Sequence, residues 1–188
     1  GDPTGVVGGM YYNSSTSKFR CYQGTAWTDC ISPWITIRKP ANQDVTNTAT
    51  LAADTDLTFA VTAATTYTVR FYVVYSGTAA AGDYKGTFTF PAAIAAKNVV
   101  GRYTATTTAD AVASSVGVLG ATTAFPTAAG LSMGVAAAAT DKRVFEGYFS
   151  FQPNAAGNLT YRFAQAAAGG AGTVARTNAN SFIEYQAL

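Results

Sequence analysis

The sequence YTVRFYVVY, residues 67–75, decides the fold class of this chain. Successive side chains of a β-strand point to opposite faces of the sheet, so the odd-numbered residues of this stretch share one face. They are Tyr67, Val69, Phe71, Val73 and Tyr75. The opposite face is mixed in character. We therefore predict a long strand whose odd-numbered face lies in a hydrophobic core.

Further strand candidates flank this stretch, and no segment has sustained helical periodicity with caps. The candidates are residues 34–38, 46–51, 57–61, 86–90, 99–106, 112–119, 144–151, 159–165 and 181–188. The turn-rich connector 152–158 predicts that 144–165 is a hairpin. About eight or nine strands without βαβ alternation favour an all-β fold, an antiparallel β-sandwich or jelly roll, over a closed barrel.

Residues 1–30 differ from the rest and read as short strands joined by tight hairpins. An isolated two-stranded hairpin is marginally stable, so this segment needs a partner. The 188 residues suit one domain and a short appendage. We predict an N-terminal β-hairpin appendage, residues 1–30, and a sandwich domain, residues 31–188.

Two cysteines, Cys21 and Cys30, lie close together around a turn, and the chain has no histidine to join them as a metal ligand. A disulfide is expected. A two-residue loop at Gly24-Thr25 would place Cys21 opposite Thr28, with Cys30 as a diagonal neighbour. A four-residue loop would place the cysteines directly opposite each other. Only the second register gives the usual Cβ separation of about 3.8 Å without adjustment, so the disulfide tests which loop is present.

Composition argues against several function classes. Charged residues make up 12%, about half the usual share, and the net charge of +2 is scattered, so nucleic-acid binding is not expected. Such a weakly charged surface tolerates burial against other subunits. No apolar run approaches the roughly 20 residues that span a bilayer, and a soluble chain without membrane insertion is expected.

Without histidine, the Ser-His-Asp and Cys-His arrangements and most zinc sites are excluded, and we expect no catalytic residues, metal or cofactor. A carboxylate pair could still hydrolyse glycosides, but solvated or subunit-facing carboxylates are the preferred interpretation. The candidates are Asp54, Asp56, Asp83, Glu146 and Glu184. Asp54-Thr55-Asp56, with Asp44, could also bind calcium. A simple turn is preferred there, because the EF-hand pattern is missing.

Four aromatic residues form the remaining candidate site: Tyr11, Tyr12, Trp27 and Trp34. Aromatic rings can stack on sugars and also carry polar edges, so these residues could form a sugar-binding platform. The preferred interpretation is an assembly surface, which seals the hairpin segment against the main domain or a neighbouring subunit.

Residues 9–13 (GMYYN), 18–22 (KFRCY) and 24–29 (GTAWTD) resemble a G-x-Y-Y-N, K-F-R-x-Y, G-x-x-W-x-D element of phage tail fibres and some bacterial surface proteins. The larger part resembles a β-sandwich domain of tailed-phage virion proteins. The segments that carry this second resemblance are residues 43–46, 50–51, 54–59, 67–75, 157–165 and 181–185. Together the two resemblances cover most of residues 9–188. The cysteine pair is a departure from the fibre element.

The resemblance implies a non-enzymatic virion structural protein, a homotrimer that serves as a capsid decoration, head fibre or tail-fibre tip. Its expected partners are copies of itself, major capsid or tail proteins, and a host surface glycan or protein, and its expected location is the virion surface. A bacterial cell-surface or secreted adhesin, or carbohydrate-binding module, is the alternative; it would present loops 79–83 or 166–173. A carbohydrate-active jelly-roll enzyme is the third hypothesis.

Overall fold

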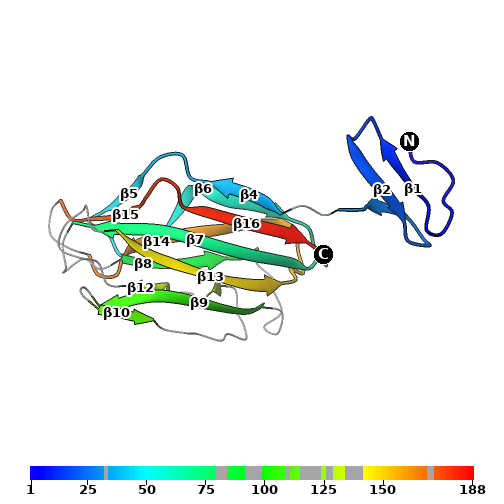
Figure 1. The fold of residues 1–188 in the computed structure, drawn as a ribbon. Helices are drawn as coiled ribbons and strands as arrows, with labels where there is room; N and C mark the ends of the chain where they lie inside the picture. The colour runs from blue at the N-terminus through cyan, green and yellow to red at the C-terminus, as the bar shows by residue number, and fades with distance from the viewer. Residues whose placement is uncertain are drawn as a thin grey trace. The chain divides into compact units, whose positions relative to one another are not determined.

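A computed structural model describes residues 1–31, 34–78, 84–91, 99–108, 111–114, 124–125, 129–133, 142–168 and 172–188 (Figure 1). The chain divides into two compact units, Gly1–Trp34 and Ile35–Leu188. The sequence-based boundary after residue 30 lies close to this division. Each unit has its own antiparallel sheet structure and is described by itself.

The N-terminal unit is a three-stranded antiparallel sheet in the order β1 (Met10–Asn13), β2 (Lys18–Tyr22) and β3 (Trp27–Asp29). The amide of Gln23 donates to the carbonyl of Ala26 at 3.3 Å, so Gly24-Thr25 is a two-residue loop. Gly24 has a φ of 100°, which glycine adopts without steric cost. A tight turn therefore joins β2 to β3.

Cys21 and Cys30 form the expected disulfide, with their Cα atoms 5.0 Å apart. Of the two registers considered, the structure has the first, because Cys21 is paired with Thr28 across β2 and β3. Cys30 lies just beyond β3, where its amide donates to the carbonyl of Phe19 at 2.9 Å. The two cysteines are diagonal neighbours on one face, and the end of β3 brings them close enough to bond without the four-residue loop.

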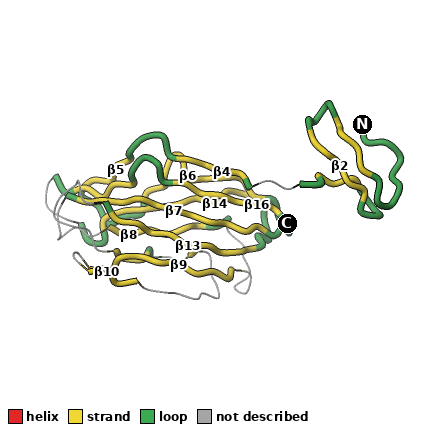
Figure 2. The backbone as a smooth tube through the Cα atoms, in the orientation of Figure 1, coloured by secondary structure: helices red, strands yellow, loops and turns green. Residues whose placement is uncertain are grey.

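The larger unit is an antiparallel β-sandwich, which confirms the predicted fold class (Figures 1 and 2). Among the described residues, one sheet has eight strands: β4 (Ile35–Arg38), β5 (Gln43–Thr46), β7 (Tyr67–Gly77), β9 (Val99–Thr108), β10 (Ala111–Ser114), β13 (Arg143–Phe151), β15 (Val174–Thr177) and β16 (Phe182–Ala187). The other has five: β6 (Ala52–Val61), β8 (Tyr84–Thr89), β11 (Ala124–Phe125), β12 (Leu131–Met133) and β14 (Gly157–Gln165). The jelly-roll form of this fold stays a prediction. The described residues contain no helix that could cross a membrane.

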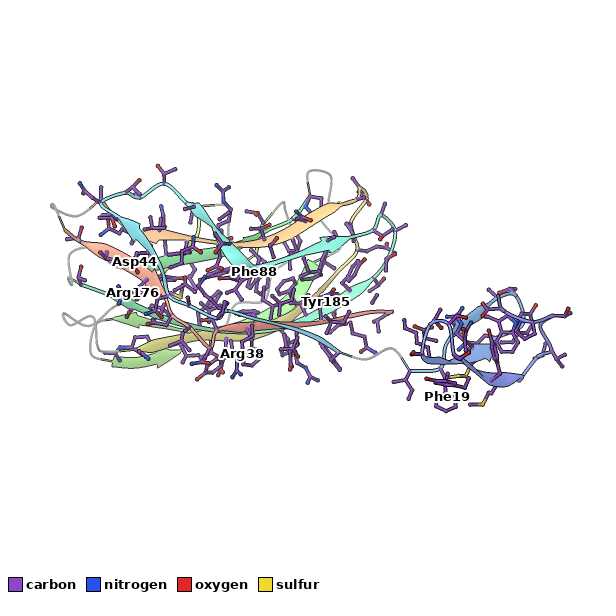
Figure 3. All side chains as sticks on the ribbon, turned by 90° about the horizontal axis from the view of Figure 1, so that it is seen from above. Phe19, Arg38, Asp44, Phe88, Arg176 and Tyr185 are labelled. Atoms are coloured by element: carbon purple, nitrogen blue, oxygen red, sulfur yellow. A yellow bond between two sulfur atoms is a disulfide. The ribbon has the colours of Figure 1, made fainter. Side chains whose placement is uncertain are left out.

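The core lies between the two sheets and is rich in aromatic rings. All five odd-numbered residues of 67–75 are buried, as predicted. Tyr185 of β16 stacks on Phe59 of β6 with ring centroids 3.8 Å apart, which joins the two sheets. Figure 3 shows Tyr185 and Phe88 between the sheets, whereas Arg38 points away from them. Burying each large apolar side chain contributes about 1.5–3 kcal/mol to folding.

The hairpin predicted for residues 144–165 is wrong. β13 pairs with β7 and β9 in the larger sheet, while β14 pairs with β6 and β8 in the smaller one. The turn at 152–158 therefore carries the chain from one sheet to the other. Phe149 of β13 and Tyr161 of β14 are both buried in the core. They enter it from opposite sheets.

The turn predicted at Asp54-Thr55-Asp56 lies inside strand β6. Ala53 is paired with Arg162 and Thr58 with Thr160, so the intervening residues of β6 form a bulge opposite Tyr161. The strand expected at 46–51 is also displaced, because β5 ends at Thr46. Strands β11, β12 and β15 were not predicted. Within the candidate 112–119, residues 115–119 lie outside the described part of the chain.

Candidate functional site

One face of the N-terminal sheet carries a network of charged and polar side chains. Tyr11, Arg20 and Asp29 are aligned across the three strands. Asp2, which precedes β1, accepts hydrogen bonds from the Tyr11 hydroxyl and, at 3.1 Å, from Arg20. Asp29 forms ion pairs with Lys18 and Arg20. The segment before β1 is thus tied to the sheet.

The same network lowers the pKa of two carboxyl groups. The hydrogen bond from the Tyr11 hydroxyl, followed by that from Arg20, lowers the pKa of Asp2. Hydrogen bonds from Lys18 and Arg20 lower the pKa of Asp29. Both carboxylates are favoured in their charged form, because donors surround them.

Trp27 completes this face of the sheet. Its ring lies edge-on to Tyr11, with centroids 4.9 Å apart, and 5.4 Å from Tyr22. Its indole nitrogen donates to the carbonyl of Pro3 at 2.7 Å. A Cβ atom on Gly5 would lie 2.1 Å from the Tyr22 ring, so the N-terminal segment packs directly on these rings. We call this the sealed face.

The opposite face of the sheet is apolar and exposed. Its large side chains, with their exposed fractions, are Met10 (68%), Tyr12 (53%) and Phe19 (57%), joined by Ile31 (71%), which lines a hollow together with Phe19. The rings of Tyr12 and Phe19 contact each other edge-on, with centroids 5.2 Å apart. The disulfide lies on this face, and Figure 3 shows it close to Phe19. We call these four residues the N-terminal apolar face.

The four aromatic residues singled out from the sequence do not share one face. Tyr11 and Trp27 are brought together on the sealed face. Tyr12 belongs to the N-terminal apolar face, because neighbouring residues of a strand point to opposite sides. Trp34 is half-buried at the end of the unit. Phe19 was missed, although its place opposite Tyr12 follows once β1 and β2 are paired.

A second candidate surface lies on the outward side of the eight-stranded sheet. Phe182 of β16, Tyr72 of β7 and Glu146 of β13 are aligned across neighbouring strands. In the adjacent row, Glu184, Arg70 and Tyr148 are aligned in the same way. We call these six residues the aromatic-charged face. They line a depression of about 450 Å³, together with Phe71, Thr104 and Gly147.

Glu146 and Glu184, two of the predicted carboxylate candidates, both lie on the aromatic-charged face. Their strands flank β7, and they are two residues out of register. Strand spacings of about 4.8 Å and 3.4 Å per residue place their Cα atoms roughly 12 Å apart. Asp83 lies outside the described residues.

The acidic residues considered for calcium are paired with cations. The Lys39 ammonium lies 2.9 Å from Asp54 and 2.8 Å from Asp56. Asp44 instead pairs with Arg176 on the surface, at 2.6 Å (Figure 3). Within the described part of the chain, no group of three or more histidine, cysteine or acidic residues could hold a metal ion. The Lys39 ammonium therefore occupies the position beside Asp54 and Asp56 that a bound calcium ion would need.

A buried hydroxyl cluster at the core was not anticipated from the sequence. The Tyr84 hydroxyl lies 2.9 Å from that of Tyr161 and 2.7 Å from that of Thr177. Burial raises the pKa of both tyrosines. These hydroxyls satisfy one another between the sheets, so the cluster is structural.

No family model, curated protein or solved structure matches this chain.

Proposed function

We propose that this protein is a non-enzymatic structural component of a tailed-phage virion, a capsid decoration or fibre protein. In this proposal the N-terminal unit forms the stem of a homotrimer that attaches to major capsid or tail proteins. The sandwich is displayed at the particle surface and stabilises the particle or contacts the host. The observation that carries the proposal is the exposed N-terminal apolar face.

The contrast between the two faces of the N-terminal sheet supports an assembly role. The N-terminal segment covers the sealed face through Pro3 and Gly5, whereas the described residues of this unit leave the N-terminal apolar face exposed. Burying a Phe or Met side chain in an interface contributes about 1.5–3 kcal/mol. Aromatic residues and Met are also enriched at such interfaces.

The disulfide supports the same role. A three-residue strand such as β3 offers little pairing of its own, and the bond between Cys21 and Cys30 ties its end to β2. A small unit with one exposed apolar face needs such a constraint to keep its shape before assembly. Phe19 and Tyr12 are thereby held in a defined arrangement.

Immunogold electron microscopy of purified virions tests the proposed location. Antibodies against the full chain should label particles of a phage that encodes it, at the capsid surface or on the tail. Labelling of the bacterial envelope, with none on purified virions, would overturn the proposal.

The second candidate function is that of a bacterial cell-surface or secreted adhesin, or a carbohydrate-binding module. The aromatic-charged face favours it, because aromatic rings and charged side chains of both signs line one depression there. Of the loops first considered for ligand binding, residues 79–83 lie outside the described chain, as do residues 169–171 of the second loop. Envelope labelling in the experiment above would support this candidate.

A further inference from the structure

The aromatic-charged face has the composition of a binding site and not of an ordinary solvated sheet surface. Phe182 and Tyr72 stack across β16 and β7, with centroids 5.6 Å apart and an interplanar angle of 15°. Tyr148, on the other side of β7, is 54% exposed. Three rings therefore gather around one depression on a surface that contacts solvent.

Charged side chains of both signs surround these rings. Arg70 and Glu146 are exposed, and Glu184 is half-buried. A smaller hollow, lined by Thr36, Arg38, Phe182 and Glu184, adjoins the depression and shares two residues with it. With two arginines and two glutamates, the formal charges of the combined surface cancel. A strongly anionic or cationic ligand would therefore meet like charges as well as opposite ones.

The polar groups can both donate and accept hydrogen bonds. Each guanidinium offers several N–H donors in a fixed plane, and each carboxylate offers two acceptor oxygens. The Thr36 hydroxyl donates to Glu184 Oε1 at 3.3 Å, which leaves that carboxylate with further acceptor capacity. A ligand rich in hydroxyl groups matches this mixture, since each hydroxyl can donate and accept.

The backbone holds these groups in place. All six residues belong to the middle strands β7, β13 and β16, whose opposite faces are packed into the core. Sites on rigid strands lose less side-chain and backbone freedom on binding than sites on loops. The depression is therefore preorganised.

We propose that the aromatic-charged face binds a neutral saccharide. The apolar face of a pyranose ring packs on the rings of Tyr72 and Phe182, and Tyr148 contacts the adjoining sugar unit. Arg70, Glu146 and Glu184 form hydrogen bonds with the ring hydroxyls. No bond is made or broken, and the inference does not rest on the trimer or on the virion location. A free chain in solution is sufficient for it.

Isothermal titration of the full chain with neutral hexasaccharides tests this inference. The probes are cellohexaose, maltohexaose, chitohexaose and a mannose hexasaccharide. At least one should bind with a dissociation constant of about a millimolar or lower, which is about −4 kcal/mol. Absence of heat and of saturation-transfer NMR signals for all four, at roughly 5 mM each, would overturn the proposal.

Two substitutions locate the site and one serves as the control. Tyr148→Ala and Glu146→Gln change exposed residues, so the fold should survive, and each should weaken saccharide binding by about tenfold. Tyr12→Ala removes an equally exposed tyrosine from the N-terminal unit and should leave saccharide affinity unchanged. Equal effects of Tyr148→Ala and Tyr12→Ala would contradict the assignment.

A charged probe tests the preference for neutral ligands. A sialylated hexasaccharide and a heparin hexasaccharide should bind more weakly than the best neutral sugar at 0.15 M salt. Tighter binding of either would overturn the neutral assignment, whatever the outcome for the oligomeric state.

Discussion

The ammonium nitrogen of Lys39 lies 2.9 Å from Oδ1 of Asp54, and the two side chains are only 1% and 0% exposed. Asp56 accepts from the same ammonium at 2.8 Å. Oδ1 of Asp54 also accepts the backbone amides of Asp56 and Leu57, each at 3.0 Å. This buried cluster holds the bulge of β6 in shape, and Lys39 supplies its positive charge.

Replacing Lys39 should therefore destabilise the sandwich strongly. Lys39→Met leaves the Asp54 carboxylate buried without its cation, and losing one partner of a buried ion pair costs about 3–5 kcal/mol. The free energy of unfolding, measured by urea denaturation, should fall by that amount. Arg176→Met is the matched control, since its partner Asp44 is exposed and such pairs contribute about 0–1 kcal/mol. Equal losses in the two variants would contradict this account.

The N-terminal sheet should lose its order in acid. The pKa values of Asp2 and Asp29 are lowered in the folded chain, so their contribution is present above the unfolded pKa of about 3.9. It is lost as the pH falls through the lower folded values. Trp27 fluorescence in a Trp34→Phe variant should therefore change below about pH 4. An additional Asp29→Asn substitution should weaken that change, and a flat profile down to pH 2 would refute the role of these carboxylates.

Reducing the disulfide should loosen the N-terminal sheet while leaving the sandwich intact. Closing a loop of this size lowers the conformational entropy of the unfolded chain, which stabilises the folded state by about 2.5 kcal/mol. The Cys21→Ser/Cys30→Ser variant loses this stabilisation. Trypsin should then cleave faster after Lys18 and Arg20. Thermal unfolding of Ile35–Leu188 should be unchanged, because the two units have separate sheets. Equal cleavage rates before and after reduction would argue against this stapling role.

Gly86 is tightly packed against the buried hydroxyl cluster. A Cβ atom there would lie 2.1 Å from the Tyr161 hydroxyl oxygen and 3.1 Å from Met133. Gly86→Ala should lower the free energy of unfolding by about 1–3 kcal/mol, as overpacking does. Because the closest atom is the hydroxyl oxygen, the double variant Gly86→Ala/Tyr161→Phe should recover part of the loss. Strict additivity in a double-mutant cycle would show that the contact is not the cause.

The strand pattern allowed the fold class to be predicted, but not the pairing of the strands. Residues 67–75 alternate cleanly, and their odd-numbered face is buried as that pattern requires. The turn chemistry of 152–158 marks a change of direction equally well within a sheet or between sheets. Only the packing of β13 and β14 against opposite sides of the core distinguishes the two cases.

The polar sequence around Asp54 was compatible with two local structures, a turn and a bulge within a strand. A cluster of Asp and Thr favours a turn, and the same side chains stabilise a bulge by accepting backbone amides. Lys39, which lies far outside this cluster in sequence, decides the outcome. The pairing of such distant residues depends on strand order, which composition does not specify.

The candidate sites differ in how much the sequence could have revealed. Tyr11 and Tyr12 are neighbours in one strand, so their separation onto two faces was predictable from strand geometry. The stacking of Tyr72 on Phe182 was not, because it needs the register of β7 against β16. The sequence did contain one indication of the aromatic-charged face, because Arg70 and Tyr72 are large side chains on the even-numbered, solvent-facing side of residues 67–75.

The oligomeric state of the full chain tests the central claim most directly. Light scattering at roughly 50 µM should give three times the chain mass of 19.4 kDa. Phe19→Glu, which places a charge on the N-terminal apolar face, should give the single-chain mass without altering the fold, because burying an unpaired charge costs several kcal/mol. A native chain that stays at 19.4 kDa, or a Phe19→Glu variant that remains trimeric, would contradict the proposed assembly through this face.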